Sequence, residues 1–235
     1  MKSITSNIPN TITCLNLLSG CIAIIMAFHG LEPVGQLMGW EWCCIFIGAA
    51  AIFDFLDGAV ARLLKAYSDI GKELDSLSDL VSFGVAPGLM MYNIMQSHCP
   101  NCWVNYLALF IPVCGALRLA RFNVMDAGMT TFRGLPIPAA AIFWIGMAGW
   151  INSYTYPQPL IMAILLVIIS LAMVSRIPMF SLKFKNLDLR ENFRRYVIIL
   201  AAISFVILYG LSGLLWTIAF YLLLSMLTRD PHRNA

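Results

Sequence analysis

Long apolar stretches separated by short polar gaps constrain this chain more than any other feature. We place them at residues 11–28, 42–63, 77–95, 104–119, 139–150, 159–174, 197–209 and 211–227. Each is bounded by turn residues or charges, as helices usually are. Hydrophobic residues make up 60% of the 235, and charged residues only 11%, against roughly 25% in soluble domains. The sequence therefore predicts an all-α, polytopic membrane protein with about eight transmembrane helices, in a single domain over residues 1–235.

The positions of Lys and Arg predict how these helices are oriented. With eight spans and a cytoplasmic N-terminus, all 15 Lys and Arg fall on the cytoplasmic side. Merging the last two stretches into one span would move Arg229 and Arg233 to the other side, which fits the positive-inside rule less well. We therefore expect both termini in the cytoplasm, the first stretch retained as a span, and a multi-pass protein of the inner (cytoplasmic) membrane. The net charge of +3 is too small and too scattered to predict a nucleic-acid partner.

Four aspartates stand at the cytoplasmic ends of two successive stretches. Asp54 and Asp57 are three residues apart, and Asp75 and Asp79 are four apart, so each pair shares one face of a helix. A short connection at residues 64–70 joins the two stretches, which places the helix ends side by side. We therefore expect the four carboxylates to converge at one depth, near the membrane interface.

Acids in such apolar surroundings need a positive partner. A charge at the centre of a membrane helix costs roughly 2.5–3.5 kcal/mol, and less near the interface. Carboxylates in this number suit Mg²⁺ or Mn²⁺, and two such ions can clamp a phosphate between attacking and leaving oxygens. Gly58 and Gly71 would let a bulky ligand approach the helices, and Arg62 can pair with a phosphate. A divalent-cation transporter is the alternative from another class, although acids confined to two adjacent helices favour a site over a path.

The spacing D-x2-D-G-x2-A-R-x8-G-x3-D-x3-D is complete from Asp54 to Asp79 and resembles the signature of the CDP-alcohol phosphotransferase family. The resemblance implies a helical membrane fold, a homodimer, two divalent metal ions, and transfer of a phospho-alcohol group with release of CMP. It also implies that the four aspartates hold the metals and that Asp79 is the catalytic base on the acceptor hydroxyl. The residues implied to contact the CDP portion are Gly58, Arg62 and Ser68.

Further segments at residues 9–20, 118–123, 132–138 and 175–183 are similar to bacterial and archaeal members of this family that use serine. This similarity implies CDP-diacylglycerol and L-serine as substrates, with the lipid drawn from the surrounding bilayer. It adds Asn10 and Thr13 to the expected ligand-binding residues. The spacing of residues does not separate serine from glycerol 3-phosphate or inositol, so those acceptors stay open as alternatives.

Arg118 and Arg121 lie one turn apart at the cytoplasmic end of the fourth stretch. One interpretation is an anion site for the serine carboxylate or a lipid phosphate, with Asn123 adding a polar contact. The other is ordinary anchoring by positive charge at the membrane surface. On the opposite side, Cys99 and Cys102 predict either a tight helix–helix turn, which we favour, or a local disulfide.

Overall fold

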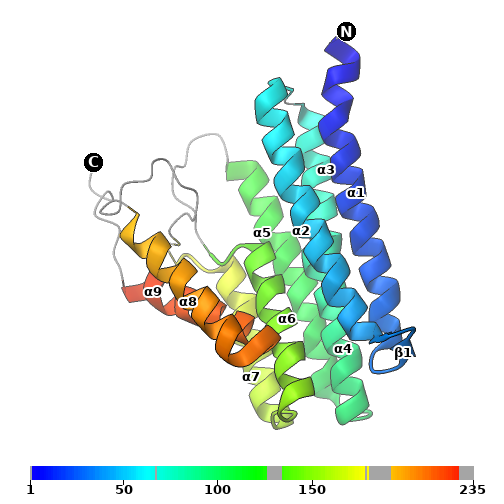
Figure 1. The fold of residues 1–235 in the computed structure, drawn as a ribbon, viewed down its shortest axis with the longest axis vertical. Helices are drawn as coiled ribbons and strands as arrows, with labels where there is room; N and C mark the ends of the chain where they lie inside the picture. Colours follow the sequence, from blue (N-terminus) through cyan, green and yellow to red (C-terminus); the bar gives the residue numbers. More distant parts are fainter. Residues whose placement is uncertain (1, 67, 126–133, 178, 180–191, 228–235) are drawn as a thin grey trace.

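The computed structural model is a bundle of upright helices with an inclined helical hairpin against one side (Figure 1). It describes residues 2–66, 68–125, 134–177, 179 and 192–227. The first two helices, α1 (Lys2–His29) and α2 (Gly39–Leu64), pack against each other along much of their length. A small antiparallel hairpin of β1 (Pro33–Val34) and β2 (Leu37–Met38) joins them at the end away from the N-terminus (Figure 1).

The third stretch is one continuous helical rod made of three segments. These are α3 (Asp69–Asp79), a π-helical segment η1 (Leu80–Val85) and α4 (Ala86–His98). The rod begins at Asp69 rather than near residue 77 because the Ser68 hydroxyl accepts a 3.0 Å hydrogen bond from the backbone N–H of Gly71 and so caps it. The predicted start was therefore eight residues too late, and Asp75 and Asp79 lie inside the rod.

The middle of the chain forms η2 (Trp103–Leu109), α5 (Phe110–Met125), α6 (Ile137–Ser153) and α7 (Pro159–Val174). Helix α6 is the most enclosed of these, and its Trp144 is fully buried. The chain enters α6 through Gly134, which has a φ of +77° and passes close to α7. A Cβ at Gly134 would lie 2.3 Å from the carbonyl oxygen of Met173, so only glycine fits there.

The last two stretches form α8 (Phe193–Tyr209) and α9 (Gly213–Leu227), joined by the short turn η3 (Gly210–Ser212). The rings of Phe205 and Phe220 lie 6.4 Å apart across the pair, so the two helices fold back on each other. Helix α9 also packs on α6, where a Cβ at Gly146 would lie 2.2 Å from the backbone nitrogen of Leu215. The chain therefore turns at Gly210, as the distribution of basic residues predicted.

Length and composition identify the helices that suit a membrane. Among the residues that the structure describes, four helical stretches are long and apolar enough to cross one: Asn7–His29, Gly39–Leu64, Trp103–Val124 and Phe193–Leu227. Two shorter apolar helices, Ile137–Ser153 and Pro159–Val174, accompany them. Large apolar side chains such as Phe55 and Leu200 are about two-thirds exposed, which suits contact with lipid rather than water. The prediction of an all-α membrane protein is confirmed.

Candidate active site

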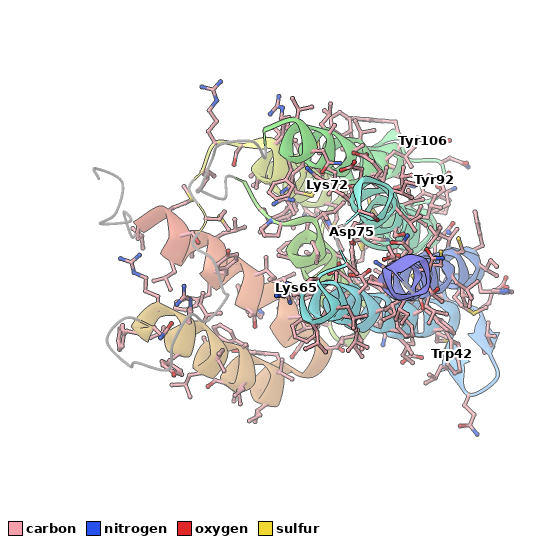
Figure 2. All side chains as sticks on the ribbon, turned by 90° about the horizontal axis from the view of Figure 1, so that it is seen from above. Trp42, Lys65, Lys72, Asp75, Tyr92 and Tyr106 are labelled. Atoms are coloured by element: carbon pink, nitrogen blue, oxygen red, sulfur yellow. The ribbon has the colours of Figure 1, made fainter. Side chains whose placement is uncertain are left out.

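The four predicted aspartates lie at the end of the bundle where α1 begins, α2 ends and α3 starts. Figure 2 looks down the bundle from this end and shows Asp75 between Lys65, which follows α2, and Lys72 on α3. The connection from α2 to α3 is tight, because Lys65 adopts a left-handed backbone conformation that ends α2. This turn brings the acidic face of α3 against that of α2.

Three of the aspartates form a compact cluster. Asp54, Asp57 and Asp75 each place one carboxylate oxygen so that all three atoms lie within 4.8 Å of one another. Asp57 is buried, at 6% exposure, while Asp54 and Asp75 are partly exposed. In the part of the chain that the structure describes, this is the one such group of His, Cys, Asp or Glu.

The fourth aspartate, Asp79, lies one turn further along the rod and falls outside this 4.8 Å set. Its charge still interacts with those of Asp54 and Asp75, and more weakly with that of Asp57. The side-chain amide of Asn16 on α1 donates to Asp79 Oδ1 over 3.4 Å. Asp79 therefore borders the cluster without being fully part of it.

The donor set fits hard divalent cations. Three carboxylates this close repel one another strongly in surroundings of low polarity, and a cation between them would remove that cost. Carboxylate oxygens are the ligands that Mg²⁺ and Mn²⁺ prefer. Asp54, Asp57 and Asp75 could hold such an ion, with Asp79 one turn further along the rod from Asp75.

Helix α1 supplies direct contacts to these acids. The hydroxyl of Thr13 donates a 2.7 Å hydrogen bond to Asp57 Oδ2. Asn10 lies beside Gly71, where a Cβ would come within 2.9 Å of Asn10 Oδ1. The room that we expected Gly71 to leave for a ligand is thus taken by Asn10, because α1 and α3 approach closely here.

The residues expected to contact the CDP portion fall into two groups. A Cβ at Gly58 would meet only the Arg62 guanidinium, at 3.7 Å, so the surface of α2 is open at that point. Arg62 itself is exposed. Ser68, in contrast, has its hydroxyl oxygen engaged as the cap of α3. Gly58 and Arg62 lie together on open surface, whereas the Ser68 hydroxyl lies at the start of α3 and caps it.

The predicted anion site at the end of α5 is only partly assembled. Arg118 is half-buried and lies within electrostatic reach of Asp79 and of Tyr221 on α9. Its Nε is buried without a hydrogen-bond partner among the described residues. Arg121 instead donates to the carbonyl of Val174 over 3.1 Å, because the last carbonyls of α7 lack partners within their own helix.

Asn123 likewise makes contacts that the sequence did not predict. Its amide donates to Ser76 Oγ over 3.0 Å and to Glu73 over 3.5 Å, both on α3. The polar contact to a bound anion that we expected of Asn123 stays a prediction. Asn123 ties α5 to the outer side of α3, next to Asp75.

Two cysteines lie at the opposite end of the molecule, in the turn between α4 and η2. Cys99 and Cys102 are free thiols here, and a hydrogen bond between them raises the pKa of Cys99. The amide of Asn105 donates to the carbonyl of Cys99 over 2.8 Å and stabilises the turn. This arrangement agrees with a tight connection between helices.

Sequence reasoning missed Asn16, Ser78 and Ser82 as residues of the site. A signal was present for Asn16, since Asn10, Thr13 and Asn16 recur at every third position where the first apolar stretch begins. Such a row of polar residues in a membrane helix marks a face that contacts other polar groups.

Comparison with known proteins places this geometry in context. The model of the CDP-alcohol phosphatidyltransferase family matches residues 6–177. A protein of Methanocaldococcus jannaschii is 41% identical over 170 residues, which are 72% of this chain and 72% of that protein. One of Bacillus subtilis is 39% identical over 171 residues, covering 72% of this chain and 88% of its own length. One of Helicobacter pylori is 30% identical over 226 residues, 93% of this chain and 89% of its own. All three bear the name CDP-diacylglycerol–serine O-phosphatidyltransferase.

Proposed function

The chain belongs to the CDP-alcohol phosphatidyltransferase family, and from this premise we propose that it transfers the phosphatidyl group of CDP-diacylglycerol to the hydroxyl of L-serine. The products are phosphatidylserine and CMP. The observation that carries the proposal is the convergence of Asp54, Asp57 and Asp75 within 4.8 Å, with Asp79 beside them. The names of the relatives support serine as the acceptor.

The acids fit a reaction at a pyrophosphate. Two divalent ions, Mg²⁺ or Mn²⁺, held by the four aspartates would neutralise the charge that develops on the phosphates. Gly58 leaves the surface of α2 open, and the exposed guanidinium of Arg62 beside it would bind a phosphate of the CDP group. Asn10 and Thr13 act from α1, where Thr13 fixes the orientation of Asp57.

Asp79 is the proposed general base. It removes the proton of the serine hydroxyl, whose oxygen then forms a bond to the phosphatidyl phosphorus. The bond from that phosphorus to the CMP oxygen breaks, and CMP leaves with the electron pair. Arg118, within electrostatic reach of Asp79, would bind the carboxylate of serine and so hold the hydroxyl near the base.

The proposed topology has eight spans, both termini in the cytoplasm, and the acids at the cytoplasmic face of the inner membrane. Its support is the placement of the helix ends. The exposed cations Arg62, Lys65 and Lys72 surround the aspartates, whereas the loops after α1, α4 and α6 contain no Lys or Arg. A homodimer, implied by the family resemblance, belongs to the same proposal.

The test is release of CMP by the purified protein in detergent, with CDP-diacylglycerol and Mn²⁺ or Mg²⁺. We expect release that depends on both metal and L-serine. Release with glycerol 3-phosphate or inositol instead would overturn serine as acceptor but keep the reaction class. No release with any acceptor, from protein that is folded by circular dichroism, would overturn the proposal. Uptake of Mn²⁺ into proteoliposomes would then favour a cation transporter.

A further inference from the structure

Two polar residues of α1, Thr13 and Asn16, each make two hydrogen bonds to the helical segments around the aspartates. The side chain of Thr13 donates to Asp57, and its carbonyl accepts from Ser78 Oγ over 3.3 Å. The side chain of Asn16 donates to Asp79, and its carbonyl accepts from Ser82 Oγ over 3.1 Å. Each residue thus contacts an aspartate through its side chain and is itself held in place through its backbone.

Asn16 is an unusual residue to find in this position. It is completely buried, and its Oδ1 has no hydrogen-bond partner among the described residues. Leaving half of a buried amide unpaired is unfavourable, so packing alone does not explain the residue. The half that is paired is the amide nitrogen, and its partner is Asp79.

Close packing fixes α1 at this level. One turn beyond Asn16, a Cβ at Gly20 would lie 2.3 Å from Ser82 Oγ and 2.9 Å from Ser82 Cα. The absence of a side chain at Gly20 lets the backbones of α1 and η1 approach, so that Ser82 reaches the carbonyl of Asn16. The Asn16 amide is therefore presented to Asp79 by a rigid contact between two helices.

We propose that Asn16 is a positioning residue for Asp79. Its amide N–H holds Asp79 Oδ1, which fixes the rotation of the carboxylate and leaves Oδ2 for the proton of the acceptor hydroxyl. The 3.4 Å separation is long, as such bonds are in sites without substrate. The inference rests on the proposed function, since it assigns Asp79 the role of base.

The decisive variant is Asn16→Leu, which keeps the volume but removes both the donor and the unpaired oxygen. We expect kcat for serine-dependent CMP release to fall about 10- to 100-fold, as when the outer partner of a catalytic group is lost. KM for CDP-diacylglycerol should not change. The thermal midpoint in detergent should not fall, because a buried unpaired oxygen has been removed. The increase in thermal midpoint on adding Mn²⁺ should persist, because the four aspartates are intact.

Matched controls separate positioning from packing. Asn93 donates to the carbonyl of Ala27 over 2.8 Å and so also joins α4 to α1, away from the acids. Asn93→Leu should lower the thermal midpoint and leave kcat unchanged. Ser82→Ala loosens the contact that holds Asn16 without removing its amide, so kcat should fall by less than in Asn16→Leu. The inference would be overturned if kcat of Asn16→Leu equals that of Asn93→Leu. It would also be overturned if kcat falls as far in Ser82→Ala as in Asn16→Leu.

Three further outcomes have distinct meanings. If Asn16→Leu does not fold, Asn16→Ser can be compared with Asn93→Leu in its place. The serine side chain is shorter and holds its hydroxyl farther from Asp79, so kcat should again be lower. If the unaltered protein shows no serine-dependent release, the proposed function has failed. If the unaltered protein is active and the Asn16 variants match the Asn93 control, only the present inference has failed.

Discussion

Thr13 on α1 donates a 2.7 Å hydrogen bond to Oδ2 of Asp57 on α2, so one oxygen of this buried carboxylate is fixed before any ligand binds. Thr13→Val keeps the shape and removes the donor. We expect the Mn²⁺ concentration for half-maximal activity to rise about 10-fold or more, because the Asp57 carboxylate is no longer held in a fixed orientation to bind the metal. Thr11→Val is the matched control, since the exposed Thr11 hydroxyl bonds only within its own helix, to Asn7. An unchanged metal requirement in Thr13→Val would argue against Asp57 as a ligand.

Asp79→Asn should reduce CMP release by about 10²- to 10⁴-fold, because an amide cannot accept the proton of the acceptor hydroxyl. The fold should persist, since the shape is unchanged and a charge next to Asp54 and Asp75 is removed. Single-turnover release of CMP measures the chemical step directly. Substantial activity in Asp79→Asn would defeat the assignment of the base.

Arg118→Gln should raise KM for serine about 10-fold or more, because a charge-assisted hydrogen bond to the carboxylate is lost. Arg121→Gln should leave KM nearly unchanged, since the Arg121 guanidinium contacts the end of α7 instead. Initial rates over a range of serine concentrations distinguish the two. Equal effects of the two substitutions would indicate general anchoring by positive charge.

Gly146→Ala should destabilise the contact between α6 and α9 by about 1–3 kcal/mol, because the new Cβ would lie 2.2 Å from the Leu215 backbone. Gly48→Ala on α2 is the control, since a Cβ there meets nothing within 4 Å. Thermal unfolding in detergent compares them. A midpoint for Gly146→Ala no lower than for Gly48→Ala would mean that α9 does not pack there as described.

The proposed orientation can be tested with cysteine labelling in intact cells. A variant that retains only Cys99 should react with a membrane-impermeant maleimide added outside. A cysteine-free variant carrying Ser68→Cys should react only after the cells are opened, because Ser68 starts α3 beside the acids. The reverse pattern would place the aspartates on the outer face.

The sequence predicted the parts of this site that depend on neighbours along one helix. Asp54 and Asp57 share a face because they are three residues apart, and the short connection to α3 brings Asp75 to them. It also predicted the turn at Gly210, because only two separate helices keep Arg229 and Arg233 on the same side as the other basic residues.

Partners that are distant in sequence could not be predicted in this way. The spacing around Asn123 says nothing about Ser76, which is 47 positions earlier and meets it only because α5 crosses α3. Spacing places Arg121 one turn from Arg118, but it does not reveal that the Arg121 guanidinium donates a hydrogen bond to the carbonyl of Val174 at the end of α7. The early start of α3 depends on the cap formed by Ser68, which the spacing of the aspartates does not reveal.

The π-helical segment η1 lies directly after Asp79 and divides the rod into two α-helical halves. The rotation of one half about the helix axis relative to the other depends on the number of residues in η1. An α-helix rotates by about 100° per residue, so each residue added to or removed from such a segment turns one half against the other. The half with Asp75 and Asp79 can therefore face α1 and α2 while the half formed by α4 keeps its own packing. Deleting one residue of η1 would twist the acids out of alignment with α2 even if every side chain of the site were retained.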